Sequence, residues 1–475
     1  MSPHHRKTVA RIIAAAGVLG LAVGCTGSVG SQQNVHPDSS VDPGPDAGTG
    51  IDTGGNGGSS DTKDAASVQD VPPAVDVPPP TDAPPAPPAM LRMVFPISGV
   101  TTAATVSARG TTDGKDVTKV TVNGVAATSS DGFLTWKASV PLNSGDNTVT
   151  ALMERGDQSQ VQVSAAVARV ASDTAIKRGK LLSGVTFALT GGSVDSKGTA
   201  MYMADANGDG VLKIDVATGD QAWSTCSEHG VPCGDGPSNG VPFSQPMDVA
   251  VDEARQRAFV IDGQNVFAVD LTGKGGPTER TIISGPDVTD SSYNPPTYAG
   301  RGSGPQAQQF GSMGYDPVAN VIYAVDWGYG NNDPVGFFKI DPETGNRTVV
   351  STIGHGGVFR QIDVSTAKGV IYSTAAYQSL LTVVKLSDGT KSNGPTIMEP
   401  QALAASDLLG AVFAVDKSGT LTAFEGTGLT SRTVAHVGGA GGLSIGGDLI
   451  FLFDGTLNGL AVFDPQNGER IVVSR

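Results

Sequence analysis

The last 300 residues repeat one arrangement of apolar and polar positions six times. Each copy has an apolar strand that ends in a polar or acidic residue, a turn, a second apolar strand and a turn with glycine. The copies begin at positions 200, 258, 321, 370, 412 and 449. A further strand precedes each copy, as in MDVAVD, and another follows most copies, as in RTVVS. Because one such unit cannot bury its own apolar faces, the repeat predicts a six-bladed β-propeller over residues 176–475.

A shorter region of alternating residues precedes the repeats. Runs such as VTKVTVNGV, FLTWKASVPL and QVQVSAAV lie between residues 91 and 170, with turn signals such as Asn123-Gly124 between them. A period of two with turns at this spacing predicts a small antiparallel β-sandwich, with Trp136 as a buried anchor. The folded part of the chain is therefore predicted to be all-β. The sandwich carries no catalytic motif and is interpreted as a spacer.

The first 25 residues have the pattern of an export signal. A basic start is followed by an apolar run over residues 12–23, which is too short to span a bilayer comfortably. The run ends in LAVGC, and this resembles the lipobox of bacterial lipoproteins. The resemblance implies that Cys25 is acylated and anchors the protein in the cell envelope, in the outer membrane if Thr26 acts as a sorting signal. An ordinary cleaved signal followed by a chance cysteine is the alternative.

Composition predicts a tether over residues 26–90 and argues against nucleic-acid binding. Residues 26–90 contain nine aspartates, one lysine and no aromatic residue, with runs such as GGNGGSS and VPPAVDVPPP, and predict a disordered tether. The whole chain has 31 Lys+Arg against 46 Asp+Glu, a net charge of -15. Phosphate contacts need clustered cations, so we expect no nucleic-acid partner. We expect a monomer that binds an envelope protein, a peptide or a glycan.

Two family resemblances extend this picture. The phrases YMAD, FVID, YAVD and FAVD resemble the NHL and YVTN repeats and gluconolactonase-like propellers, and residues 91–170 resemble Ig-like modules of the glucodextranase accessory type. Gluconolactonase-like enzymes hold a divalent metal with a glutamate at the start of the first blade, where this chain has SGVTFALTGG. Glu399 and Arg360, at the entries of later repeats, are candidates to project toward the axis instead.

The repeat predicts a face on which the first strand of every copy ends. The residues at these ends are Asp205, Asp262, Asp326, Thr374, Asp416 and Asp454. Each could cap its own turn through side-chain-to-backbone hydrogen bonds, or together they could form an electronegative face for cations or basic partners. In the first copy, Asp205, Asn207 and Asp209 match the opening of a calcium loop, although the glutamate expected at the twelfth position is missing. Calcium and a plain hairpin turn both remain open.

The longest loops fall on the same predicted face. Cys226 and Cys233 lie in one of them, and we expect a disulfide because exported thiols tend to pair; two free thiols are the alternative. Aromatic and basic residues gather on neighbouring loops, where they form a stacking surface for sugar or peptide or pack the loops down; they are Tyr293, Tyr298, Arg301, Trp327, Tyr329 and Tyr377. Three histidines lie in the connections after the first, third and fifth repeats, without the H-x-H or H-x-x-x-H spacing of a zinc site; they could share a zinc ion or remain exposed to solvent, and they are His229, His355 and His436.

These observations predict an envelope lipoprotein whose propeller is a non-catalytic binding module. The H-E-x-x-H motif and the phosphate loop are both absent from the sequence. The alternative function is a metal-dependent hydrolase or lyase of the gluconolactonase-like type, with calcium as a possible cofactor.

Overall fold

The fold is known from a computed structural model that describes residues 90–182, 188–226, 240–272, 280–289, 297–326, 335–353, 359–375 and 379–475. The chain divides into two compact units, residues 1–83 and 84–475, and every described residue lies in the second. The predicted signal, the anchor Cys25 and the tether lie outside the described residues, apart from Met90.

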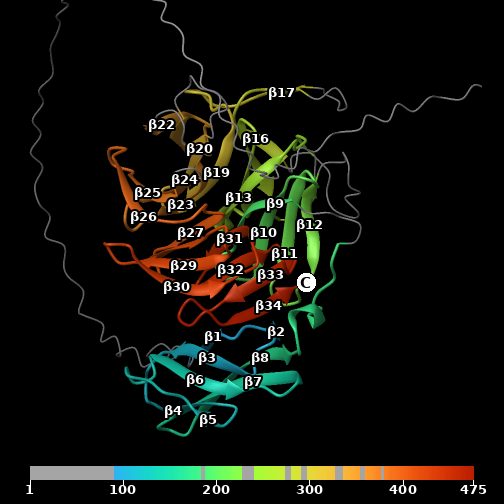
Figure 1. Cartoon of the computed structure of the whole chain (residues 1–475), viewed down its shortest axis with the longest axis vertical. Helices are drawn as coiled ribbons and strands as arrows, with labels where there is room; N and C mark the ends of the chain where they lie inside the picture. The colour runs from blue at the N-terminus through green and yellow to red at the C-terminus, as the bar shows by residue number, and fades with distance from the viewer. Residues whose placement is uncertain are drawn as a thin grey trace, which may run out of the picture. The chain divides into compact units, whose positions relative to one another are not determined.

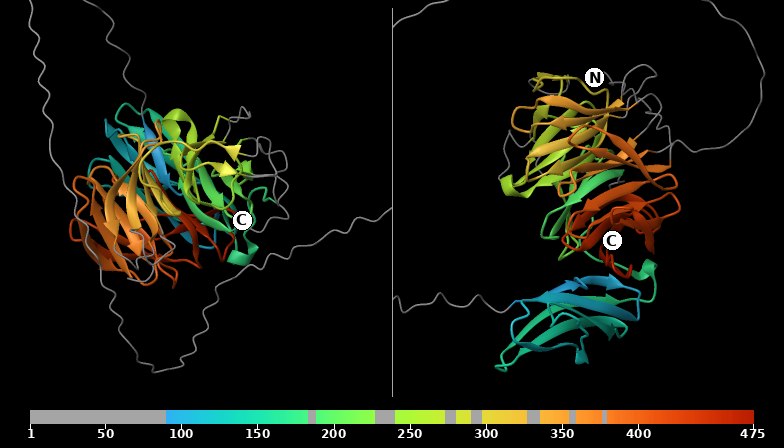
Figure 2. Two further views of the ribbon diagram at one scale, coloured as in Figure 1. Left: turned by 90° about the horizontal axis from the view of Figure 1, so that it is seen from above. Right: turned by 90° about the vertical axis from the view of Figure 1, so that its left-hand side faces the viewer.

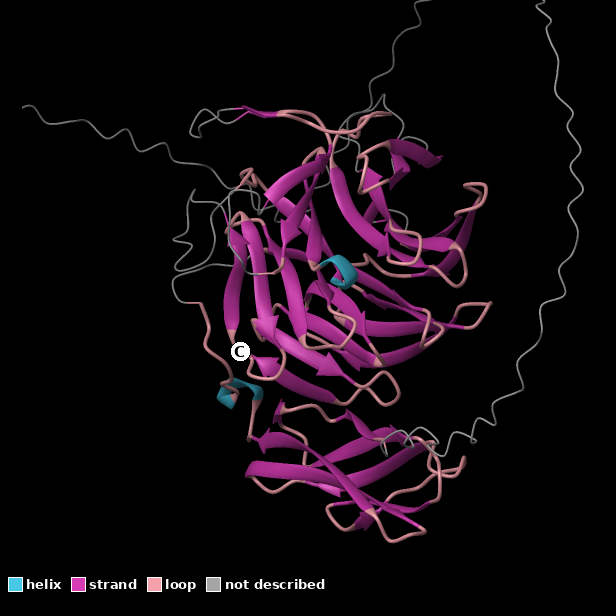
Figure 3. Ribbon diagram, turned by 180° about the vertical axis from the view of Figure 1, so that it is seen from behind, coloured by secondary structure: helices cyan, strands magenta, loops and turns pink. Residues whose placement is uncertain are grey.

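Regular structure in the described ranges is β-strand, apart from two short 3-10 turns, η1 (Asp173–Ala175) and η2 (Glu253–Arg255) (Figure 3). The all-β prediction is confirmed. Neither helical turn has the length or apolar character that a membrane span requires.

Residues 90–170 form an N-terminal β-module. Its strands are β1 (Leu91–Phe95), β2 (Gly99–Thr101), β3 (Thr105–Thr112), β4 (Val117–Val122), β5 (Val125–Ala126), β6 (Thr135–Pro141), β7 (Gly145–Arg155) and β8 (Gln160–Arg169). One sheet has the order β1-β3-β6, and β8, β7, β4 and β5 belong to another. Buried and exposed residues alternate along β6, and Trp136 is buried opposite Gly110, as the period of two requires. A Cβ at Gly110 would overlap the indole of Trp136.

The repeat region consists of antiparallel four-strand groups, which we call sheets 1 to 6 in chain order (Figure 1). Sheet 1 contains β9 (Leu189–Val194), β10 (Ala200–Asp205), β11 (Gly210–Asp215) and β12 (Gln221–Cys226). Sheet 2 contains β13 (Pro246–Asp252), β14 (Arg257–Asp262), β15 (Asn265–Asp270) and β16 (Arg280–Ser284). Sheet 3 contains β19 (Phe310–Asp316), β20 (Val321–Asp326), β21 (Val335–Ile340) and β22 (Arg347–Ile353).

The remaining sheets follow the same order. Sheet 4 contains β23 (Phe359–Ser365), β24 (Val370–Ala375), β25 (Leu380–Lys385) and β26 (Lys391–Thr396). Sheet 5 contains β27 (Ala402–Ser406), β28 (Ala411–Val415), β29 (Thr420–Glu425) and β30 (Thr430–His436). Sheet 6 contains β31 (Ala440–Gly446), β32 (Leu449–Asp454), β33 (Gly459–Phe463) and β34 (Arg470–Ser474). A two-stranded ribbon, β17 (Val288–Thr289) with β18 (Thr297–Tyr298), lies in the connection between sheets 2 and 3.

The first strands of the sheets surround an axis. Strands β9, β13, β19, β23, β27 and β31 contact one another in this order, and β31 contacts β9 (labelled in Figure 1, with two further views in Figure 2). Second strands such as β10, β20 and β32 are buried along their whole length, because neighbouring sheets cover both of their faces. Their sequences therefore read as continuous apolar runs. This arrangement of four-stranded sheets is that of a β-propeller-type fold.

Glycines in the turns between third and fourth strands bring neighbouring sheets together. Gly468 has φ +74°, and a Cβ there would lie 1.9 Å from the Val434 carbonyl oxygen on the outermost strand of sheet 5. Gly219 makes the equivalent approach to Val473, at 2.1 Å. The same approach occurs at two more turns, from Gly345 to Ile283 and from Gly389 to Val350. The glycine of the repeat is thus required for close packing, and we call these four residues seam glycines.

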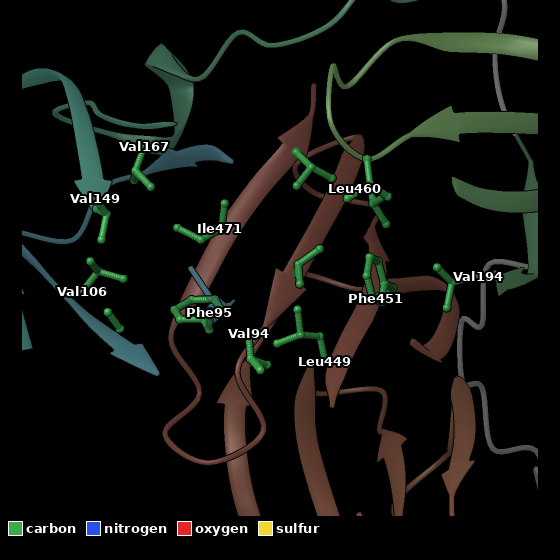
Figure 4. Close-up of a cluster of buried hydrophobic side chains, with 14 of the residues drawn as sticks. Val94, Phe95, Val106, Val149, Val167, Val194, Leu449, Phe451, Leu460 and Ile471 are labelled. Atoms are coloured by element: carbon green, nitrogen blue, oxygen red, sulfur yellow. The ribbon is translucent and has the colours of Figure 1, made fainter. Parts of the chain in front are cut away.

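The N-terminal β-module shares a sheet with sheet 6. Strand β2 lies parallel to β8 and antiparallel to β34, so one nine-stranded sheet runs from β31 to β5. Arg109 of β3 pairs with Asp464 at 3.0 Å and with Asp448 at 3.3 Å. Side chains of both regions belong to one apolar cluster, in which Phe95 of β1 and Ile471 of β34 take part (Figure 4). The predicted boundary at residues 171–175 contains η1, but backbone pairing continues across it through β2.

Candidate functional site

The aspartates at the ends of the second strands are mostly buried. Asp262 is 5% exposed and accepts hydrogen bonds from the backbone N–H groups of Ser244 and Gln245, which lead into the first strand of its own sheet. Asp326 accepts in the same way from Gln308 and Gln309, at 2.9 and 3.1 Å. The carboxylates therefore hold the incoming connection against the sheet, in addition to any turn that they cap. Because most of these side chains are buried, they do not form an exposed acidic face.

Sheets 4 and 5 lack this hydrogen bonding between a strand-end carboxylate and the incoming connection in the described structure. Sheet 4 has Thr374 at the equivalent position, and its buried hydroxyl has no hydrogen-bond partner among the described residues. In sheet 5, Asp416 accepts from Ser418 and Thr420 within its own turn, at 2.9 Å each. The described hydrogen bonds of these two side chains therefore do not tie an incoming connection to its sheet.

The predicted calcium loop is a tight hairpin between β10 and β11. Asp205 is fully buried, and its Oδ1 accepts from the backbone N–H groups of Ala188 and Asn207, at 2.8 and 3.1 Å. Burial raises the pKa of the Asp205 carboxyl. Asn207 is exposed and Asp209 half-buried. Among the described residues, no group of three or more His, Cys, Asp or Glu side chains is arranged to hold a metal ion. Calcium at this turn remains a prediction.

Two residues of the predicted stacking surface can be described, and both hold their loop in place. Tyr298 of β18 packs against the apolar cluster that contains Phe243 and Phe267. Arg301 exchanges backbone hydrogen bonds with Gly285 and donates from its side chain to the Glu343 carbonyl oxygen. These contacts favour the interpretation that the loop residues pack the loop. Four residues and one side chain lie outside the described part; they are Tyr293, Trp327, Tyr329, Tyr377 and the side chain of Arg360.

Glu399 does not line the cavity described below. Its side chain is 53% exposed and pairs with Lys417 at 2.7 Å. Its projection toward the axis remains a prediction. His436 is exposed at the end of β30, whereas His229, His355 and Cys233 lie outside the described residues, together with the side chain of Cys226. The zinc and disulfide hypotheses therefore remain predictions.

A cavity of about 540 Å³ lies on the axis of the ring. All six first strands contribute to its wall, and turns between first and second strands form its mouth. First strands and second strands are antiparallel, so this mouth is at the end opposite to the strand-end aspartates. The cavity thus opens on the face opposite to the one predicted to carry the long loops. Small residues such as Gly192, Gly314 and Ala405 in its lining leave space near the crowded axis.

One side chain crosses the axis on the inner side of this cavity. Gln361 of sheet 4 donates from Nε2 to the carbonyl oxygen of Thr190 in sheet 1, at 3.4 Å. The Thr190 hydroxyl in turn donates to the Pro246 carbonyl oxygen of sheet 2, at 3.1 Å. These bonds connect sheets on different sides of the ring. They give the cavity a polar floor, toward which a ligand entering from the mouth would extend.

Two carboxylates stand in the wall of the axial cavity. Asp248 of β13 accepts from the Ser312 hydroxyl at 2.7 Å and from the Met313 N–H at 3.0 Å, and so joins sheets 2 and 3. Asp363 of β23 accepts from the Ala405 N–H at 2.7 Å and joins sheets 4 and 5. Burial, with a smaller effect from the charge of Asp363, raises the pKa of Asp248 to about 7. Burial and the charge of Asp407 raise the pKa of Asp363 to about 6.

Two rim carboxylates of the cavity are paired with cations. Asp252 binds Arg255 and Arg257 at 3.2 and 2.9 Å, and Glu253 pairs with Lys197 at 3.6 Å. No lysine, arginine or histidine lines the cavity within the described ranges. The carboxylates without a cationic partner in the described lining are Asp248 and Asp363 in the wall and Asp195 and Asp407 at the rim. Such a wall attracts a cation and repels an anion.

Sequence reasoning missed a serine in this wall. Ser444 lies in Gly442–Gly446, which reads G-x-S-x-G, the pattern of a hydrolase nucleophile elbow. Here the pattern is part of the extended strand β31, and the Ser444 hydroxyl accepts a hydrogen bond from the Val194 N–H at 3.0 Å. The elbow requires a sharp strand-to-helix turn and a histidine nearby, and neither surrounds Ser444 in the described structure. Ser444 therefore joins sheets 6 and 1.

Comparison with known proteins adds no function. No protein-family model and no curated protein matches the chain. A structural-genomics protein of unknown function from Bacteroides thetaiotaomicron VPI-5482 is 14% identical over 82% of this chain and 99% of its own, with a TM-score of 0.45. The nidogen/laminin complex shows 12% identity over 61% and 90%, with a TM-score of 0.38. Hydrazine synthase of Kuenenia stuttgartiensis shows 11% identity over 67% and 91%, with a TM-score of 0.39. Strand pairing within this chain makes it an all-β protein with a β-propeller-type array of sheets.

Proposed function

We propose that this protein is a cell-envelope lipoprotein whose six-bladed propeller is a non-catalytic binding module, carried on an Ig-like β-sandwich. The LAVGC sequence supports anchorage through Cys25. The closed order of contacts among the six first strands supports six blades. The shared sheet through β2 supports a sandwich that holds the propeller rigidly. Replacing Cys25 by Ser is expected to move the protein from the membrane fraction to the soluble fraction.

The axial cavity carries the proposal of binding. Its volume of about 540 Å³ falls in the range of small-ligand sites. Its polar side chains mostly serve the ring itself: Asp248, Asp363 and Ser444 each bond to the backbone of a neighbouring sheet. At the rim the Ser196 hydroxyl donates to the Glu253 carboxylate, but no histidine is among the lining residues that the structure describes to relay a proton. We therefore propose that the cavity holds a ligand without cleaving it.

The charge of the cavity indicates the class of ligand. Asp248 and Asp363, which have no basic partner among the described lining residues, favour a ligand that carries an ammonium group, such as an amine or the lysine side chain of a peptide. The unliganded carboxylates take up protons near pH 6 and 7, because burial disfavours their charge. A cationic ligand would displace these protons. We therefore expect binding to strengthen as the pH rises from 5 to 8.

Calorimetric titration of the purified protein with putrescine tests this proposal. The matched control is 1,4-butanediol, which has the same length and no charge. Putrescine is expected to bind at pH 8, at least tenfold more weakly at pH 5, and at least tenfold more weakly to the Asp363→Asn variant. Equal binding of diamine and diol, or no binding of either, would refute a cation site in the cavity.

A metal-dependent hydrolase or lyase is the other function that the sequence suggests. No observation among the described residues favours it, since Glu399 pairs with Lys417 at the surface and the Asp205 carboxylate faces backbone N–H groups. Metal analysis of the purified protein separates the two functions. A stoichiometric divalent ion that is lost on replacing Asp209 by Ala would favour the enzyme.

A further inference from the structure

The contact between sheets 4 and 5 differs from the other described contacts between neighbouring sheets. At four of them, a seam glycine packs against the outermost strand of the preceding sheet. In sheet 5 the turn between β29 and β30 covers residues 426–429, and a Cβ at Gly426 would meet nothing within 4 Å. The carboxylate tie is also missing where the chain passes from sheet 4 into sheet 5, because the described hydrogen bonds of Asp416 stay within its own turn. Two stabilising devices are therefore missing around one seam, which we call seam 4–5.

At seam 4–5 the turn carries the large side chain and the outermost strand carries the glycine, which is the reverse of the other seams. Leu429 has φ +50° and occupies the turn position at which Gly468 and the other seam glycines stand. At the other seams a valine or isoleucine faces the glycine, as Val434 faces Gly468. Gly394 of β26 occupies the position of these branched residues. A Cβ at Gly394 would lie 3.3 Å from Leu429 Cδ1. The leucine thus enters the seam from the turn, and the turn backbone stays away from β26.

The consequence is an open groove. It has a volume of about 600 Å³, with Ser392–Pro395 of β26 on one side and Gly426–Leu429 on the other. Tyr372 and Val383 lie beneath it. Most residues of β26 are exposed or half-buried, including both of its ends. Outermost strands with few buried contacts have a low free energy of local opening.

Seam 4–5 is well held at its inner end. Asp407 of the turn between β27 and β28 accepts from the Ser365 hydroxyl and from the Ala367 N–H, the latter at 2.9 Å. Asp363 accepts from the Ala405 N–H. Strong inner contacts and weak outer contacts define a hinge near Asp407. We propose that the ring opens locally at seam 4–5, with the outer strands of sheet 4 moving away from sheet 5 about this inner hinge.

This movement has a consequence for the axial cavity. Thr366 and Asp407 line the cavity, and Lys368 of the same turn as Thr366 lines the groove. The turn over residues 366–369 is thus a wall shared by both spaces. Opening of the seam would shift this wall, whether or not the cavity holds an amine.

Hydrogen exchange of the native protein measures the opening directly. We compare protection factors of β26 with those of β22 and β30, the equivalent outermost strands that a seam glycine covers. The expected result is protection at least tenfold lower in β26. Equal protection in the three strands would overturn the proposal.

A variant that restores the common seam gives a second measurement. Leu429→Gly together with Gly394→Val places a glycine in the turn opposite a branched residue, as at the other seams. The protection of β26 is expected to rise at least tenfold, whereas Leu429→Gly alone empties the seam and lowers it. A folded double variant with unchanged protection would contradict the proposal, and the native comparison decides if the double variant does not fold.

Discussion

Replacement of Gly468 by Ala tests the packing of the seams most directly. The added Cβ would lie 1.9 Å from the Val434 carbonyl oxygen, so the two sheets must separate by about 1.5 Å to reach ordinary van der Waals contact. Alanine at φ +74° also costs about 1–2 kcal/mol of backbone strain. Overpacking of this kind adds about 1–3 kcal/mol. We expect a loss of about 2–5 kcal/mol in the free energy of unfolding.

Gly426→Ala is the matched control. Gly426 has φ +69°, close to that of Gly468, and lies in the equivalent turn of sheet 5, but a Cβ there meets nothing within 4 Å. It should therefore show the strain of about 1–2 kcal/mol alone. Urea unfolding, followed by the fluorescence of Trp136 and Trp223, gives the difference between the two variants. Equal losses in both would mean that Gly468 does not press against Val434, and the account of the seams would fail.

Three further predictions concern buried charge. The pKa of Asp248 is raised to about 7, above the value of about 3.9 in the unfolded chain, so its contribution to stability is lost as the pH rises through 7. Asp248→Asn should therefore remove about 2–3 kcal/mol of the difference in unfolding free energy between pH 5 and pH 8, measured by urea unfolding. An unchanged difference would contradict the shift. Arg109→Ala leaves the buried Asp464 without its cation and should cost about 3–5 kcal/mol, whereas the exposed Arg432→Ala should cost under about 1 kcal/mol; similar losses would argue against the buried pair. Asp262→Ala releases two backbone N–H groups at the entry to β13 and should lower the thermal midpoint, with faster proteolysis of the connection between sheets 1 and 2; normal protease resistance would count against the anchoring role.

Much of the fold could be predicted from local patterns. Alternation in the segment around Trp136 predicts a strand with one buried face, and β6 has this pattern. Continuous apolar runs such as VIYAVD predict strands covered on both faces, and β20 is buried along its length. Aspartate at the strand ends was recognised as a recurring position. Its role as an anchor for the incoming connection required the tertiary structure, because Ser244 and Asp262 are separated along the chain and meet only when the sheet forms.

The candidate site was much less predictable. Asp248 and Asp363 lie in short strands that look like ordinary core segments, and only closure of the ring brings them to one cavity. Glu399 could not be placed from its position at a repeat entry, since its exposed pair with Lys417 depends on a residue of another turn. Ser444 lies in a recognisable motif, but its surroundings give it a structural contact instead of a chemical one.

By itself, the sequence determined the class of the chain: strands from the period of two and four-stranded units from the repeat. The export signal read from the apolar run before Cys25 remains a prediction. These properties depend on neighbours within a few residues of each other. Only the tertiary structure decided that the cavity opens opposite the strand-end aspartates, that β2 joins the module to β34, and that Leu429 and Gly394 exchange sizes at one seam. The physical reason is that burial, charge and close packing depend on residues far apart in the chain, which come together only when the ring closes.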